Sequence, residues 1–174
     1  MEGKNYINGA FVDGTSGDRF ESRNPANFDE ILGTFPLSSE QDVNNAVSAA
    51  KTAYDGWRRL SRIKRGEHFD EFVQLLKKDR EEISRLVTKE CGKGIVEGRA
   101  DVTEGIHMVQ YTFGTVRMPH GDVVDSEIPE KDAFMRRKPK GVVAAISPWN
   151  FPFAIPLWLI CPSVVEGNTV ILKP

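Results

Sequence analysis

The chain has 174 residues, of which 40% are hydrophobic and 28% are charged, as is ordinary for a folded globular protein. Its formal net charge of -2 excludes the strongly basic balance of most nucleic-acid-binding proteins, so we expect no nucleic-acid partner. Two cysteines, Cys91 and Cys161, are too few for a disulfide framework and predict a reducing, cytoplasmic location.

Residues 5–36 contain short apolar segments separated by Asn-Gly, Asp-Gly, Ser-Gly and Asn-Pro pairs. These pairs are typical of tight turns, because Gly, Asn and Pro readily adopt turn conformations. The region therefore predicts strands near residues 5–8, 10–12, 19–23 and 30–34.

Four amphipathic helices are predicted next, because apolar residues recur at helical spacing between Val43 and Val116. Ser38 and Gln41 form a capping-box pattern at the start of the first helix. Gly92 suits the C-terminal cap of the third helix, since glycine readily adopts the left-handed conformation. The apolar stripes predict that the helices pack against one another.

Several polar residues in this region are assigned structural roles. Glu97, Asp101 and Glu104 share one face of the fourth predicted helix, which we expect to be solvated. We expect no metal site, because the three histidines lack metal-ligand spacing with cysteines or carboxylates. Both cysteines are expected to be structural.

Residues 122–138 predict a hairpin that pairs with another surface, because two apolar segments flank a turn at Pro129–Asp132. Arg136, Arg137, Lys138 and Lys140 form a basic run at its end. We interpret this run as a solvated strand edge, since positive charges discourage wrong strand pairing.

Residues 141–174 predict a β-α-β unit, with strands at 142–146 and 169–172 and a helix ending near Val165. The uncharged stretch 141–165 is long enough to span a bilayer, but it contains four prolines, which favour a buried strand, turn and helix. We therefore expect no membrane association. Ligands bind at the carboxyl ends of such parallel strands, so Ser147–Asn150 and Lys173 should lie close together.

Asn150 is the main candidate for chemistry, because an asparagine in an apolar segment is costly unless its amide is used. Its two N–H donors could stabilise an oxyanion at the mouth of the sheet. The alternative is a turn asparagine that bonds its own backbone.

Lys173 follows a strand that should be buried, and it either contacts a ribose or phosphate or simply points into water. No Gly-x-Gly-x-x-Gly fingerprint accompanies it, so the common dinucleotide loop is not predicted.

Two sequence motifs carry a family resemblance. Ser147–Pro152 reads Ser-Pro-Trp-Asn-Phe-Pro, and Glu166–Pro174 reads Glu-Gly-Asn-Thr-Val-Ile-Leu-Lys-Pro. At this spacing they resemble the NAD(P)-dependent aldehyde dehydrogenase superfamily. Three further segments resemble parts of that family. Tyr6–Gly9 resembles its N-terminal strands, and Glu90–Lys93 resembles a helix junction. Arg137–Val143 resembles the strand that enters its cofactor domain. The resemblance extends over essentially the whole chain.

The resemblance implies roles for individual residues. Asn150 matches the asparagine whose amide, with a backbone N–H of the nucleophile, holds the oxyanion of the thiohemiacetal. Lys173 matches the lysine that binds the adenosine ribose of NAD or meets the 2′-phosphate of NADP. Four further residues match positions along the nicotinamide-ribose and diphosphate path: Ile146, Ser147, Pro148 and Trp149.

The resemblance also implies an α/β fold in three parts. Residues 1–121 would be the N-terminal strands and helices of the cofactor domain, and residues 122–140 an oligomerisation hairpin. Residues 141–174 would be the first β-α-β unit of a truncated Rossmann-type core. The family's nucleophilic cysteine and general-base glutamate come later in its sequence, and neither cysteine here matches the nucleophile motif.

We therefore expect the N-terminal portion of an oxidoreductase, without its catalytic domain and inactive alone. The intact enzyme would oxidise an aldehyde to a carboxylic acid through a thioester, with NAD or NADP as hydride acceptor. The alternative is a natural short, non-catalytic assembly or interaction module. We also expect a homo-oligomer formed through residues 122–138, and self-association at the open edge of strand 169–172.

Overall fold

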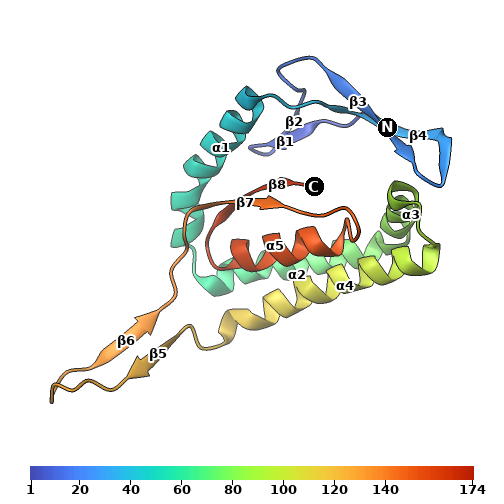
Figure 1. Ribbon diagram of the computed structural model, residues 1–174. Helices are drawn as coiled ribbons and strands as arrows, with labels where there is room; N and C mark the ends of the chain where they lie inside the picture. Colours follow the sequence, from blue (N-terminus) through green and yellow to red (C-terminus); the bar gives the residue numbers. More distant parts are fainter.

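In the computed structural model, which describes residues 1–174, the chain begins with two antiparallel hairpins (Figure 1). The first pairs β1 (Asn5–Ile7) with β2 (Ala10–Val12), and the second pairs β3 (Arg19–Asn24) with β4 (Asn27–Pro36). The four predicted strands are confirmed. Asn8 and Gly9 join β1 to β2 with φ angles of 52° and 78°, the left-handed conformation that a two-residue hairpin turn requires.

Helices occupy most of residues 40–117. They are α1 (Glu40–Arg59), α2 (Arg62–Lys78), α3 (Arg80–Cys91) and α4 (Ile95–Gly114), followed by the 3-10 turn η1 (Thr115–Arg117). The four predicted helices are confirmed. Gly92 caps α3 with a φ of 66°, as predicted from its lack of a Cβ atom.

The cap of α1 lies one residue later than predicted. Ser39, rather than Ser38, is the N-cap, and Asp42, rather than Gln41, completes the capping box. The Asp42 carboxylate accepts hydrogen bonds from the backbone N of Ser39 at 2.8 Å and of Thr15 at 3.1 Å. The contact with Thr15 explains the shift, because it joins the loop after β2 to the start of α1.

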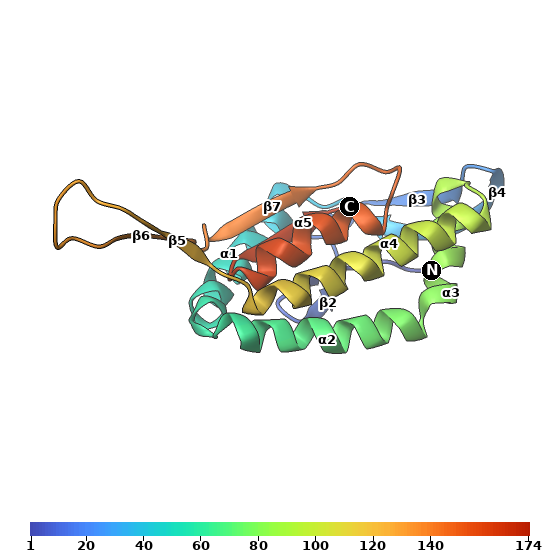
Figure 2. The ribbon, with the colours of Figure 1, turned by 90° about the horizontal axis from the view of Figure 1, so that it is seen from below.

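The hydrophobic core lies within the helical layer. α4 packs against α2, α3 and α5 (Ala154–Val165), and α2, α4 and α5 run side by side in Figure 2. The 11 core residues are Phe69, Val73, Leu76, Val87, Val102, Ile106, Val109, Val116, Leu157, Cys161 and Val165. The predicted packing of the apolar stripes against one another is therefore confirmed.

A two-stranded hairpin projects away from the helical layer (Figures 1 and 2). β5 (Gly121–Val124) pairs with β6 (Ala133–Arg136) in an antiparallel register that places Val123 opposite Phe134. These two side chains are 84% and 77% exposed. The predicted hairpin is confirmed, and the basic run that follows it is exposed as expected.

The last part of the chain is the predicted β-α-β unit. β7 (Val142–Ile146) and β8 (Thr169–Lys173) are parallel, and α5 connects them. α1 packs on both strands, and the Thr169 hydroxyl donates a hydrogen bond to the carbonyl of Ala50 at 3.0 Å. The whole is a mixed α/β fold. None of its five α-helices combines the length and the apolarity that crossing a bilayer requires.

Candidate functional site at the carboxyl ends of β7 and β8

The turn 147–153 leaves β7 at the carboxyl end of the parallel strand pair. Ile146 lies opposite Lys173 in the register, and the backbone N of Ser147 donates to the carbonyl of Lys173 at 3.2 Å. The prediction that this segment and Lys173 lie close together is therefore confirmed for Ser147, the first residue of the turn. Both segments end at the edge of the sheet where open α/β folds bind ligands.

Most of the predicted site residues expose their side chains at this edge. Ile146 is 73% exposed and Trp149 is 84% exposed, and Pro148, Asn150 and Lys173 are exposed as well. Ser147 differs, because its hydroxyl oxygen is buried and has no hydrogen-bond partner. A buried hydroxyl without a partner is uncommon in folded proteins.

Asn150 bonds to the chain through its backbone and not through its side chain. Its carbonyl accepts a hydrogen bond from Lys93 Nζ at 2.8 Å, whereas its side-chain amide has no partner within the chain. Asn150 is exposed, so it does not carry the burial cost that first drew attention to it. It is also not a turn asparagine that bonds its own backbone, and both amide N–H groups are free to meet a ligand.

The junction between α3 and α4 holds the inner side of the turn. Lys93 Nζ, besides donating to Asn150, lies 4.8 Å from the centre of the Phe151 ring. The thiol of Cys91 donates to the carbonyl of Trp149 at 3.3 Å. Two consecutive carbonyls of the turn therefore face this junction, although nearly sixty residues separate them from it in the sequence.

Asp101 is a functional candidate that the sequence interpretation placed wrongly. Glu97 and Glu104 are exposed as expected, but Asp101 is fully buried. Its Oδ1 accepts a hydrogen bond from the backbone N of Ala154 at 2.8 Å, and its Oδ2 lies 3.7 Å from Lys93 Nζ. A carboxylate at this position bonds a free N–H at the start of α5 and complements the positive end of the helix dipole.

Neither cysteine has the surroundings of a reactive thiolate. Cys161 is 1% exposed, and burial raises the pKa of its thiol to about 12. Burial also raises the pKa of the Cys91 thiol. Catalytic cysteines need a lowered pKa or an adjacent base, so the expectation that both are structural agrees with the geometry.

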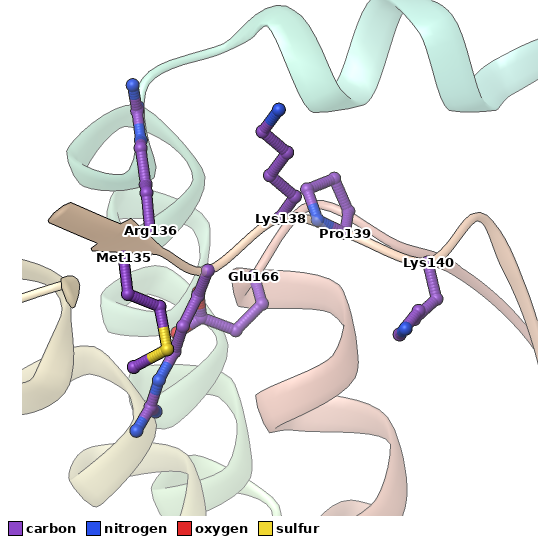
Figure 3. Close-up of a pocket in the computed structure, with 7 residues that line it drawn as sticks. Met135, Arg136, Lys138, Pro139, Lys140 and Glu166 are labelled. Carbon is purple, nitrogen blue, oxygen red and sulfur yellow. The ribbon is translucent and has the colours of Figure 1, made fainter. Parts of the chain in front are cut away.

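A shallow cavity of about 560 Å³ lies at the opposite end of the parallel strands, at the base of the β5–β6 hairpin (Figure 3). Glu166 and the run Met135–Lys140 line it, and none of the predicted site residues does. The labelled basic side chains diverge in Figure 3 rather than converge on one point. This arrangement does not form a cationic site.

The comparison with protein families assigns the chain. The sequence profile described as "Aldehyde dehydrogenase family" matches residues 11–174. The chain belongs to this family. It is 39% identical over 170 residues to the alpha-ketoglutaric semialdehyde dehydrogenase of Bacillus subtilis, which covers 98% of this chain and 35% of that enzyme. The chain therefore spans about a third of the length of this aldehyde dehydrogenase.

Solved structures agree with the family assignment. PnpE in complex with nicotinamide adenine dinucleotide superposes with a TM-score of 0.93 and 30% identity, over 100% of this chain and 36% of that one. An NADP-dependent enzyme of E. coli superposes with a TM-score of 0.94 and 29% identity, again over 100% of this chain and 36% of that one. The fold of this chain is thus the fold of the corresponding part of both proteins.

The sequence identified the mostly exposed residues of the candidate site, Ser147–Asn150 and Lys173. It did not identify Lys93 and Asp101, which support the turn from its inner side. The Glu90–Lys93 segment carried a resemblance to the family but no assigned task, and Asp101 was taken for a surface residue. One local signal was available, because Gly92 ends α3 and places Lys93 in the junction before α4. The contacts of Lys93 with the turn, however, depend on tertiary packing.

Proposed function

We propose that this chain forms one wall of the active site of an NAD(P)-dependent aldehyde dehydrogenase. One observation carries the proposal: in a member of this family, the unbonded amide of Asn150 is exposed at the carboxyl end of β7, where that strand ends beside Lys173. The reaction would convert an aldehyde to a carboxylic acid through a thioester with an enzyme cysteine.

Asn150 would stabilise the oxyanion that forms when a thiolate attacks the aldehyde carbonyl. A fixed amide N–H aimed at developing negative charge stabilises the transition state more than the ground state. The exposure of the Asn150 amide and its lack of an internal partner support this role. A donor that was already hydrogen-bonded within the chain would have to break that bond before it could bind the oxyanion.

Lys173 and the residues before Asn150 would bind the cofactor, which supplies the hydride acceptor of the reaction. The exposed ammonium group of Lys173 suits ribose hydroxyls or a 2′-phosphate. Ile146, Pro148 and Trp149 offer exposed apolar surface beside it. We propose that these residues, with Ser147, line the path of the nicotinamide ribose and the diphosphate.

The nucleophile and the general base would come from outside residues 1–174. The raised pKa values of Cys91 and Cys161 support this part of the proposal. We expect no NADH formation when the chain alone is mixed with NAD⁺ and acetaldehyde or alpha-ketoglutaric semialdehyde. Aldehyde-dependent absorbance at 340 nm that disappears in a Cys91→Ser variant would place the nucleophile within the chain instead.

The role of Asn150 can be tested in a chimera in which this chain replaces the matching segment of the Bacillus subtilis enzyme. We expect Asn150→Ala to lower kcat by about 10²–10³-fold, the effect of removing one oxyanion donor. The KM for NAD⁺ should change little. Asn44→Ala, at an exposed position in α1, serves as the matched control and should leave kcat unchanged. Equal activity of the two variants would remove Asn150 from the reaction.

We further propose that the β5–β6 hairpin joins two copies of the chain. Its exposed apolar pair, Val123 and Phe134, supports this assignment, because exposed apolar surface of this kind is typical of interaction sites. Replacing both residues with Lys should abolish concentration-dependent association in sedimentation experiments. Val96→Lys, at a position in α4 that is 75% exposed, is the control.

The same hairpin supports the alternative function, a non-catalytic assembly module. The two functions differ in their response to the chimera. Hairpin-dependent association together with an inactive, folded chimera would favour the module, whereas Asn150-dependent turnover would favour the enzyme.

A further inference from the structure

The position of Asn150 is set by the backbone of its turn. Its side-chain amide has no hydrogen-bond partner within the chain, so no hydrogen bond of its own orients it. A catalytic donor must nevertheless be held within a fraction of an ångström of its productive position. The groups that fix the backbone on either side of Asn150 are therefore the ones that would fix its amide.

Three successive carbonyls of the turn are bonded, and each has a different donor. The carbonyl of Trp149 accepts from the Cys91 thiol at 3.3 Å, and that of Asn150 accepts from Lys93 Nζ at 2.8 Å. The carbonyl of Phe151 accepts from the backbone N of Ile155 at 3.2 Å, within the start of α5. Of these donors only Lys93 is charged, and charge-assisted hydrogen bonds are roughly twice as strong as neutral ones.

Lys93 is itself held in place. Its side chain is only 15% exposed, and its ammonium group lies 3.7 Å from the buried carboxylate of Asp101. The other oxygen of that carboxylate bonds the backbone N of Ala154, the first residue of α5. The Asp101 carboxylate therefore connects Lys93, which binds the middle of the turn, to α5, which follows the turn. The Phe151 ring, 4.8 Å from the ammonium group, adds a third contact.

We propose that Lys93, held by Asp101, is the positioning residue of Asn150. Its bond to the Asn150 carbonyl fixes the peptide plane between Asn150 and Phe151, and with it the backbone from which the exposed Asn150 side chain projects. The inference rests on the proposed function in one respect, since a positioned amide matters only if that amide takes part in the reaction. Lys93 itself touches no reacting atom.

The experiment measures backbone order and hydrogen exchange in the 174-residue chain itself. In the unchanged chain we expect ¹⁵N order parameters of about 0.85 at Trp149, Asn150 and Phe151, the value of rigid backbone. In Lys93→Met they should fall below about 0.6. Exchange of the Ile155 amide should accelerate about tenfold, because its acceptor lies in the loosened turn.

Three matched variants separate positioning from general stability. Lys93→Arg keeps a cationic donor and should restore most of the order. Lys89→Met removes a lysine of α3, four residues before Lys93, that pairs with Glu30 on β4, and it should leave the turn unchanged. The Val143 and Ala145 amides of β7 serve as internal references and should exchange at the original rate in every variant.

The outcomes are distinct for this inference and for the proposed function. An ordered turn in Lys93→Met, or exchange that accelerates equally in β7 and in the turn, would overturn the positioning role. Asn150→Ala should leave the turn ordered, because its side chain holds nothing in place. A disordered turn in Asn150→Ala would make its amide a structural group and count against the proposed function, while the result for Lys93 would stand.

Discussion

Two asparagines at opposite ends of the same β-α-β unit have opposite surroundings. Asn168, before β8, is 8% exposed, and its side chain bonds the backbone of Ser163, Lys140 and Gly141 at 2.9, 2.6 and 3.0 Å. Asn150, after β7, is exposed, and its side chain bonds nothing in the chain. The first amide stabilises the fold, whereas the second is exposed and makes no hydrogen bond within the chain.

The two ends of α5 repeat this contrast. At its C-terminal end the buried Arg65 donates to the carbonyl of Val165 at 2.8 Å, and also to the carbonyl of Leu60 just after α1. Glu166 bonds both Arg62 and His120 there. At the N-terminal end Lys93 donates to the carbonyl of Asn150 and Asp101 accepts from the backbone N of Ala154, while the side chains of Trp149, Asn150 and Phe151 remain exposed. Side-chain hydrogen bonds therefore close the C-terminal end of α5, which we call the closed end. At the N-terminal end, Lys93 and Asp101 support the turn from the inner side, and its outer side chains stay exposed to solvent.

The largest expected effect concerns the closed end. Arg65→Met would leave the carbonyls of Leu60 and Val165 without this donor, and we expect the free energy of unfolding to fall by about 2–4 kcal/mol. Urea denaturation measures this change. Arg58→Met, which removes an exposed cation paired with Asp55, should change stability far less, because solvent screens an exposed ion pair. Similar losses in both variants would contradict the assignment of Arg65.

The two asparagines give the most direct test of the comparison. Asn168→Ala should lower the free energy of unfolding by about 2–3 kcal/mol, because three partly buried backbone groups lose their partner. Asn150→Ala should change it by no more than about 0.5 kcal/mol, as for an exposed residue without contacts. Thermal or urea unfolding of the two variants side by side decides the point, and a reversed order would refute the comparison.

The close packing of α4 on α5 gives an effect of intermediate size. A Cβ atom on Gly105 would lie 2.6 Å from ring carbons of Phe153, at the end of the turn that carries Asn150. We expect Gly105→Ala to destabilise the chain by about 1–3 kcal/mol through overpacking. Gly56→Ala in α1, where nothing lies within 4 Å, should instead be stabilising by up to about 1 kcal/mol.

The closed end should also respond to acid. Burial raises the pKa of Glu166, but the hydrogen bonds from His120 and Arg62 outweigh this effect, so its pKa lies below the ordinary value of 4.5. A lowered pKa in the folded state stabilises the protein above the unfolded-state value, and the stabilisation is lost as pH falls through the folded-state value. Stability should therefore decline below about pH 4.5, and Glu166→Gln should weaken that decline. Urea titrations between pH 6 and pH 3 test this, and parallel curves for both proteins would contradict it.

The smallest effect concerns the two thiols. Iodoacetamide at pH 8 should modify the partly exposed Cys91 slowly and leave Cys161 unmodified, because burial holds the Cys161 pKa near 12. Mass spectrometry with and without urea distinguishes the two sites. Rapid modification of Cys161 in the folded chain would mean that α5 opens more readily than its packing suggests.

The features that could be predicted from the sequence are those that depend on residues close to one another along the chain. The Asn8-Gly9 turn, the glycine cap at Gly92 and the β-α-β order of residues 141–174 follow from local conformational preferences and periodicity. The pairing of Ile146 and Ser147 with Lys173 was also predictable, because parallel strands bring their carboxyl ends to one edge. The exposure of Asn150 was not, since its apolar neighbours suggested burial.

The amino-acid sequence by itself determined the elements, their order and the amide that the site presents. Only the tertiary structure decided that Asp101 is buried, that Ser39 rather than Ser38 caps α1, and that Lys93 holds the turn. The physical reason is the same in each case. Each depends on a hydrogen bond or ion pair with a segment at least 24 residues away, such as the contact between Thr15 and Ser39. A helical period reports which residues share a face, but not which distant backbone group that face will meet.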